Sequence, residues 1–111
     1  MQALAHCEQA LARSREIGDP ETEASAWDSL GYIHRWRGRY TEAVTCYERA
    51  IAIRRDIGNR YHEAASLDHL GDARQEAGDR AAAEAAWRQA LDILDQLNHP
   101  QADDVRIKLD G

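Results

Sequence analysis

The fold is decided by residues 27–70, which read WDSLGYIHRWRGRYTEAVTCYERAIAIRRDIGNRYHEAASLDHL. Apolar and glycine positions of this stretch recur at a constant offset of 40 residues. The pairs that share the offset are Trp27/Leu67, Leu30/Leu70, Gly31/Gly71, Gly38/Gly78, Ala43/Ala83, Tyr47/Trp87, Ala50/Ala90, Ile51/Leu91 and Ile53/Ile93. The register also extends upstream, where Cys7 stands 40 residues before Tyr47. A fixed period of this length indicates an array of structural repeats.

The spacing within one unit predicts its shape. Trp27 and Leu30 begin one apolar run, and Ala43, Tyr47 and Ala50 form a second run at helical intervals. A glycine between the runs allows the chain to reverse. Each unit is therefore expected to be a pair of antiparallel helices, and the chain to be all-α.

These residues resemble the tetratricopeptide repeat family, whose pattern has a tryptophan, a Leu-Gly pair, then alanine, an aromatic residue and alanine. The matching positions are Trp27, Leu30, Gly31, Ala43, Tyr47 and Ala50 in one unit, and Leu67, Leu70, Gly71, Ala83, Trp87 and Ala90 in the next. His34 and Arg74 stand where the pattern has tyrosine, and its closing proline is missing. The 40-residue period resembles the long-helix branch of the family. The resemblance implies a right-handed α-solenoid of about two and a half units.

A single domain, residues 1–111, is expected from the length and the repeat register. Glycine or asparagine and a following capping residue separate the helices, as in Gly18-Asp19-Pro20. The predicted parts are the second helix of an incomplete unit at 2–17, repeat units at 20–57 and 60–97, and a capping helix at 100–109. Within the units, the helices are expected at 20–37, 40–57, 60–77 and 80–97.

Composition restricts the classes of function. The formal net charge is −6, which argues against a nucleic-acid-binding surface spread over the whole molecule. No apolar run is long enough to be a signal peptide or a membrane span, so a cytoplasmic location is the default expectation. Cys7 and Cys46 form no Cys-x-x-Cys pair, and both are expected to be reduced.

No catalytic motif or zinc-site spacing occurs, so we expect neither an enzyme nor a metal or cofactor. His62, His69 and Asp72 are the nearest approach to a metal site. However, histidines seven residues apart on one helix are separated by about 10 Å along the axis. Asp68 and Asp72 could suggest carboxylate catalysis, but a solvated or partner-binding face is favoured.

The run from His34 to Tyr40 interleaves arginines with aromatic residues, as nucleic-acid-binding surfaces do. Arginines in the last turn of a helix are also stabilised by the helix dipole, and their stems cover neighbouring aromatic surface. This second interpretation is favoured because the chain is acidic. Trp36 lies outside the buried register.

In the resembling family, first helices line a concave groove and second helices cover the back. The groove residues are then Ser25, Asp28, Ser29, Tyr32, Arg35 and Trp36 in one unit, and Ala65, Asp68, His69, Asp72, Gln75 and Glu76 in the next. Family members that clamp a peptide carboxylate use lysines and asparagines on this face. Here Asp28, Tyr32, Asp68 and Asp72 occupy those positions, so a ligand with basic and aromatic or aliphatic groups is expected. Arg54, on a second helix, is expected on the back.

The resemblance implies a non-catalytic module that binds a protein or peptide. The segment Leu97 to Arg106 is similar to the end of tetratricopeptide domains in actinobacterial transcriptional regulators of the antibiotic regulatory protein and signal-transduction ATPase types. The sensory or assembly end of a regulator is therefore the first hypothesis. A peptide-pheromone sensor is the alternative, and a nucleic-acid-contacting module is least favoured.

The N-terminal helix has no preceding first helix in this sequence, so its outer flank should expose Ala3, Ala5, Ala10 and Ala12. Exposed stacking edges favour association. A two-fold arrangement would cover the same edge on both copies. A homodimer through residues 2–17 is therefore predicted.

Overall fold

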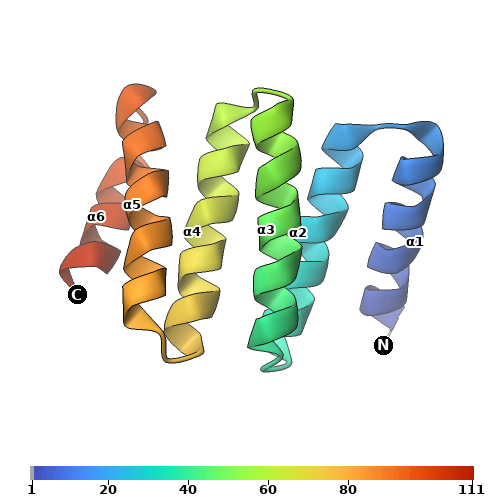
Figure 1. Ribbon diagram of the computed structural model, residues 1–111, viewed down its shortest axis with the longest axis horizontal. Coiled ribbons are helices and arrows are strands. Elements are labelled where there is room, and N and C mark those ends of the chain that lie inside the picture. The colour runs from blue at the N-terminus through green and yellow to red at the C-terminus, as the bar shows by residue number, and fades with distance from the viewer. Residues whose placement is uncertain (1) are drawn as a thin grey trace.

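The computed structural model describes the backbone of residues 2–111 and the side chains of residues 4–111. Helices make up almost all of this part, and no strand occurs within it. The six helices are α1 (Gln2–Ile17), α2 (Pro20–Trp36), α3 (Tyr40–Asp56), α4 (Arg60–Glu76), α5 (Arg80–Gln96) and α6 (Ala102–Asp110). They follow one another in a row, with the two chain ends at opposite ends of the row (Figure 1). The all-α solenoid is confirmed.

Short turns separate the helices where glycine or a capping side chain was expected. Gly18 and Gly58 adopt positive φ angles of 76° and 73°, which suit the reversal after a helix. Asp19 and Asn59 then accept hydrogen bonds from the backbone amides of Thr22 and His62. Each of the four long helices from α2 to α5 ends one residue before its predicted end.

The last helix differs more from the prediction. It begins at Ala102 and ends at Asp110, whereas 100–109 was predicted. Asn98 takes the positive φ of 52° that glycine supplies at the earlier turns. The Gln101 amide donates a 3.1 Å hydrogen bond to His99 Nδ1, so the chain forms a turn before the helix begins.

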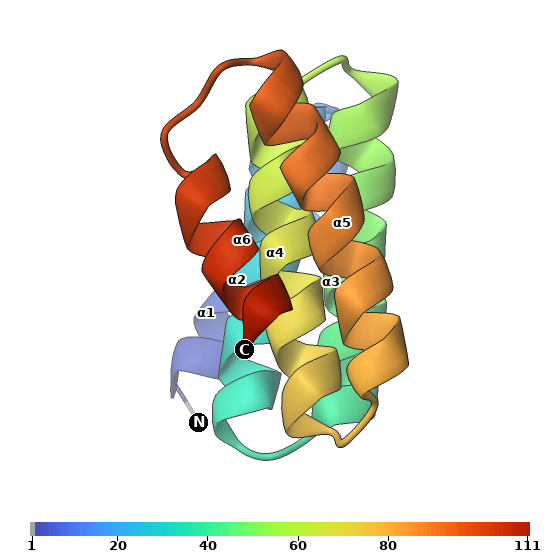
Figure 2. The same cartoon turned by 90° about the vertical axis from the view of Figure 1, so that its left-hand side faces the viewer.

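The helices lie in two layers. Seen from the C-terminal end, α3 and α5 lie on one side and α2 and α6 on the other, with α4 beside α5 (Figure 2). We call the surface of α2, α4 and α6 the first-helix face, and the opposite surface, carrying α3 and α5, the second-helix face. Consecutive helices pack against each other along the whole array.

The glycines of the Leu-Gly pairs bring the two helices of each unit close together. Tyr47 of α3 lies against Gly31 of α2, where an added Cβ would be 2.8 Å from the tyrosine ring. In the next unit the Trp87 indole lies directly against Gly71, where a Cβ would collide with it. Both aromatic side chains are almost fully buried. Close contact at a residue without a side chain therefore joins α2 to α3 and α4 to α5.

The core has two parts. The larger part is formed by the four helices from α3 to α6 and surrounds Tyr47, Trp87 and Val105. The smaller joins α1, α2 and α3 around Leu11, Leu30 and Cys46. Both cysteines are free thiols, and burial raises the pKa of Cys46 to about 11.

The first helix exposes Ala5, Ala10 and Ala12, whereas the predicted neighbour Ala3 lies outside the described side chains. Ala50 and Ala90, which stand 40 and 80 residues after Ala10, are fully buried. Self-association through α1 stays a prediction.

Candidate functional site

The first-helix face carries the predicted groove residues on two neighbouring helices. Ser25, Asp28, Tyr32, Arg35 and Trp36 belong to α2, and Asp68, His69, Asp72 and Gln75 belong to α4. The structure brings most of them into three groups: a hollow between the two helices, a second hollow at the end of α2, and a set of ion pairs. Gln75 is exposed and lines neither hollow.

The first hollow lies between α2 and α4 and has a volume of about 260 Å³. Its lining comprises Asp28, Ser29, Tyr32, Ile33, Tyr47 and His69. The buried Tyr47 ring reaches this hollow from α3 and contacts the exposed His69 ring, at 5.7 Å between centroids. Burial raises the pKa of Tyr47 to about 12, so its phenol stays protonated at neutral pH. The hollow can therefore accept an apolar or aromatic group.

The second hollow adjoins the first through their shared residue, Tyr32. Three aromatic side chains line it, together with Arg35 and Glu76, around a volume of about 440 Å³. Tyr32 and Trp36 are one helical turn apart, with ring centroids at 6.2 Å and edge-to-face orientation. Tyr32 is 53% exposed and Trp36 is 75% exposed. Large aromatic side chains at this exposure are typical anchors of protein interfaces.

Asp28 is neutralised from within the fold. Arg54 Nη2 lies 3.0 Å from Asp28 Oδ2, and the Ser66 hydroxyl donates a 2.9 Å hydrogen bond to the same carboxylate. Burial raises the pKa of Asp28 above its ordinary value, and the neighbouring Arg54 offsets part of that rise. This carboxylate is already paired and hydrogen-bonded without a ligand.

The second pair of acidic residues is bridged by the last helix. Lys108 Nζ of α6 lies 2.8 Å from Asp68 Oδ1 and 3.1 Å from Asp72 Oδ1. Burial acts to lower the pKa of Lys108, but the two carboxylates outweigh it and the pKa is raised. Lys108 therefore remains charged and occupies the place that a basic ligand group would take.

Arg35 is paired as well. Its Nε and Nη2 donate hydrogen bonds of 2.8 and 2.7 Å to the two carboxylate oxygens of Glu76. This bidentate pair raises the pKa of Arg35 and lowers that of Glu76. Because every acidic residue among the predicted groove residues is paired internally, the expectation of a ligand with basic groups loses its physical basis.

The expected position of Arg54 was wrong. This arginine is only 3% exposed and reaches from α3 to Asp28 of α2. It also donates a 3.3 Å hydrogen bond to Ser25 on the first-helix face. Its repeat equivalents Ser14 and Leu94 are buried too. The apolar Leu94 was the sequence signal that this position belongs to the core.

The histidines do not form a metal site. His69 lies against Tyr47, whereas His62 lies against the Tyr61 ring and within 3.1 Å of the Asn59 side chain. Within the described residues, no group of three His, Cys, Asp or Glu side chains could hold a metal ion. Across the same part of the chain, no helix is long and apolar enough to cross a membrane.

The comparisons with known proteins agree with the geometry. A family model described as tetratricopeptide repeat matches residues 22–96, from the first turn of α2 to the end of α5. No curated protein matches the chain. The matched region holds both complete helix pairs and both hollows of the first-helix face. The chain belongs to the tetratricopeptide repeat family.

Proposed function

We propose that this chain is a non-catalytic module that captures an uncharged, aromatic or aliphatic segment of a partner protein on its first-helix face. Tetratricopeptide repeats generally mediate protein–protein interaction. The observation that carries the proposal is the contrast on this face between exposed rings and paired charges. Tyr32 and Trp36 are exposed beside two hollows, whereas Asp28, Asp68 and Asp72 already have internal cationic partners.

The two hollows suggest how a segment would bind. They adjoin along α2 and share Tyr32, so neighbouring side chains of an extended segment can enter them in succession. Tyr32 and Trp36 would be the anchors, since interface energy concentrates in aromatic residues. Ser29 and His69 at the first hollow would supply polar contacts to the segment backbone.

The setting of the module in a sensory or assembly part of a regulator belongs to the same proposal. It is supported by the similarity of the segment from Leu97 to Arg106 to the ends of such regulators, and by the long 40-residue repeat. A location in the cytoplasm follows from that setting.

Selection of random peptides displayed on phage against the chain would test the proposed chemistry. We expect enrichment of aromatic and aliphatic residues without an excess of either charge. Tyr32→Ala and Trp36→Ala should each raise the dissociation constant of a selected peptide by about 30-fold, because an interface anchor contributes about 2 kcal/mol. Fluorescence polarisation with the labelled peptide measures the dissociation constant.

Ile17→Ala is the matched control, because Ile17 is 72% exposed at the end of α1 and lines neither hollow. It should leave the affinity unchanged, and all three variants should keep the helical circular dichroism spectrum. Selected peptides that bind the Tyr32 and Trp36 variants as tightly as the unaltered chain would contradict the proposed site. Enrichment of basic peptides would contradict the proposed ligand chemistry.

A further inference from the structure

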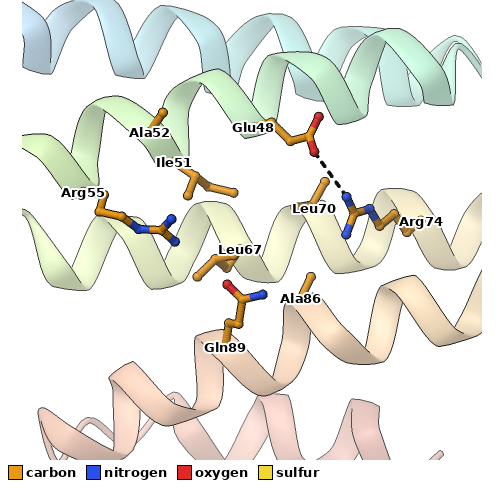
Figure 3. Close-up of a pocket in the computed structure, with 9 residues that line it drawn as sticks. All are labelled: Glu48, Ile51, Ala52, Arg55, Leu67, Leu70, Arg74, Ala86 and Gln89. Atoms are coloured by element: carbon orange, nitrogen blue, oxygen red, sulfur yellow. Dashed lines mark hydrogen bonds and ion pairs between the residues drawn. The ribbon is translucent and has the colours of Figure 1, made fainter.

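The second-helix face has a hollow of its own, between α3 and α5 and above α4, with a volume of about 280 Å³ (Figure 3). Aliphatic side chains form its floor, among them Ile51, Leu67 and Leu70. Glu48 and Arg74 form an ion pair at one end, and the Arg55 guanidinium lies at the other. This hollow shares no residue with the two hollows of the first-helix face.

The repeat register shows what fills the equivalent place in the preceding unit. Forty residues before Leu67 stands Trp27, and forty before Arg55 stands Arg15. The Arg15 guanidinium lies 5.3 Å from the centroid of the Trp27 ring, and that of Arg49 lies 5.1 Å from it. In the first unit, the chain's own indole therefore occupies this position between cationic side chains.

Part of the surroundings of the indole is repeated in the second unit. The indole itself is not repeated, and Gln89 stands where the first unit has Arg49. Trp27 Nε1 donates a 3.3 Å hydrogen bond to Glu23, whose repeat equivalent is Glu63. Arg55 lies 2.9 Å from Glu63, as Arg15 lies 3.5 Å from Glu23. The hollow thus exists because leucine replaces tryptophan at position 67, while the arginine and the glutamate that accompany the ring are kept.

The charges at the hollow also favour an aromatic group. The buried Glu63 carboxylate is shared by Arg55 and Arg60, at 2.9 and 3.4 Å, so two cations face one carboxylate. Within the described residues, the two Nη groups of Arg55 donate no hydrogen bond to a side chain or backbone group. Figure 3 shows this guanidinium extended over the side of the hollow near Ile51 and Leu67. A guanidinium in that place can stack on an aromatic ring.

We infer that this hollow is a second docking site, which receives a tryptophan side chain from a segment of a partner protein. The inserted indole takes the position that Trp27 holds in the first unit, and Arg55 stacks on its face. The mouth of the hollow carries the exposed Ala52 and Gln89, which leave room for the segment's backbone to cross between α3 and α5.

The test uses the whole chain with ¹³C-labelled methyl groups and the probe peptide Ac-Gly-Ser-Trp-Ser-Gly-NH₂. Ring currents should shift the methyl signals of Ile51, Leu67 and Leu70 as the probe is added. The same peptide with leucine in place of tryptophan should bind at least tenfold more weakly. Shifts confined to Ile33 and other groups of the first-helix face would overturn the inference.

Two substitutions close the hollow in different ways. Leu67→Trp rebuilds the arrangement of the first unit and should abolish probe binding. Ala52→Tyr covers the mouth from an exposed position, so it keeps the test decisive if the first variant does not fold. Ala85→Tyr, on an exposed part of α5 that does not line the hollow, should bind the probe normally.

Arg55→Gln should lower the affinity for the probe peptide by about two- to fivefold, which is the contribution expected of a cation that stacks on an aromatic ring. Arg88→Gln is the control, because Arg88 is exposed on α5 and does not line the hollow.

Undiminished probe binding in both Leu67→Trp and Ala52→Tyr would overturn the inference that the probe binds in this hollow. N-acetyl-tryptophanamide that bound as tightly as the peptide would show a small-molecule pocket, and so overturn the protein segment as occupant.

Discussion

Replacement of Gly71 by leucine is expected to lower the free energy of unfolding by about 3 kcal/mol, the upper part of the range for overpacked cores. The Trp87 indole lies directly against Gly71, so even a Cβ at this position would collide with it. Trp87 is only 3% exposed and donates a hydrogen bond to the Asp68 carbonyl, so it has no open space into which to move. Urea unfolding followed by circular dichroism measures the change.

Ala85→Leu provides the control for this substitution. It introduces the same leucine side chain on the exposed part of α5 and should change the unfolding midpoint little. Because each solenoid unit depends on its neighbours, the damage at Gly71 should extend along the array and lower the midpoint of one common transition. A midpoint for Gly71→Leu equal to that of Ala85→Leu would contradict the packing of α4 against α5 described above.

Arg54→Ala is the second substitution with a large expected effect. It removes the cation 3.0 Å from Asp28 and leaves that partly buried carboxylate with the Ser66 hydroxyl alone. Removal of one partner of a fully buried ion pair costs about 3–5 kcal/mol. The Asp28 side chain is 21% exposed, so water screens part of the loss and we expect about 2 kcal/mol.

A double-mutant cycle with Asp28→Asn separates the ion pair from the packing of the arginine stem. Once Asp28 no longer carries a charge, Arg54→Ala should cost less than in the unaltered chain. The exposed Arg88→Ala is the control and should be close to neutral. If Arg54→Ala proves as mild as Arg88→Ala in urea unfolding, Arg54 does not hold α2, α3 and α4 together in solution.

The repeat and its helices could be predicted because the information is periodic and local. Glycines and capping side chains mark each turn, and the offset of 40 residues fixes which positions face the core. The helix ends therefore differ by only one residue from α2 to α5. The start of α6 was less predictable, because Asn98 and His99 organise a turn of their own there.

The ion pairs of the first-helix face could not be predicted in the same way. They join residues on different helices through long side chains, whose reach depends on the packing. The position of Arg54 on a second helix predicts that it lies on the back, and the sequence presents Lys108 only as part of a capping helix. The hollow above Leu67 likewise depends on how far α3 and α5 stand apart.

The salt dependence of binding tests the central claim most directly. The claim is that the first-helix face binds through exposed rings, because its charges are already paired within the fold. For a peptide selected on the chain, the dissociation constant should change less than twofold between about 50 and 500 mM sodium chloride, since screening weakens mainly charged contacts. A tenfold weakening over this range would contradict the claim and show that charged side chains of the face bind the partner.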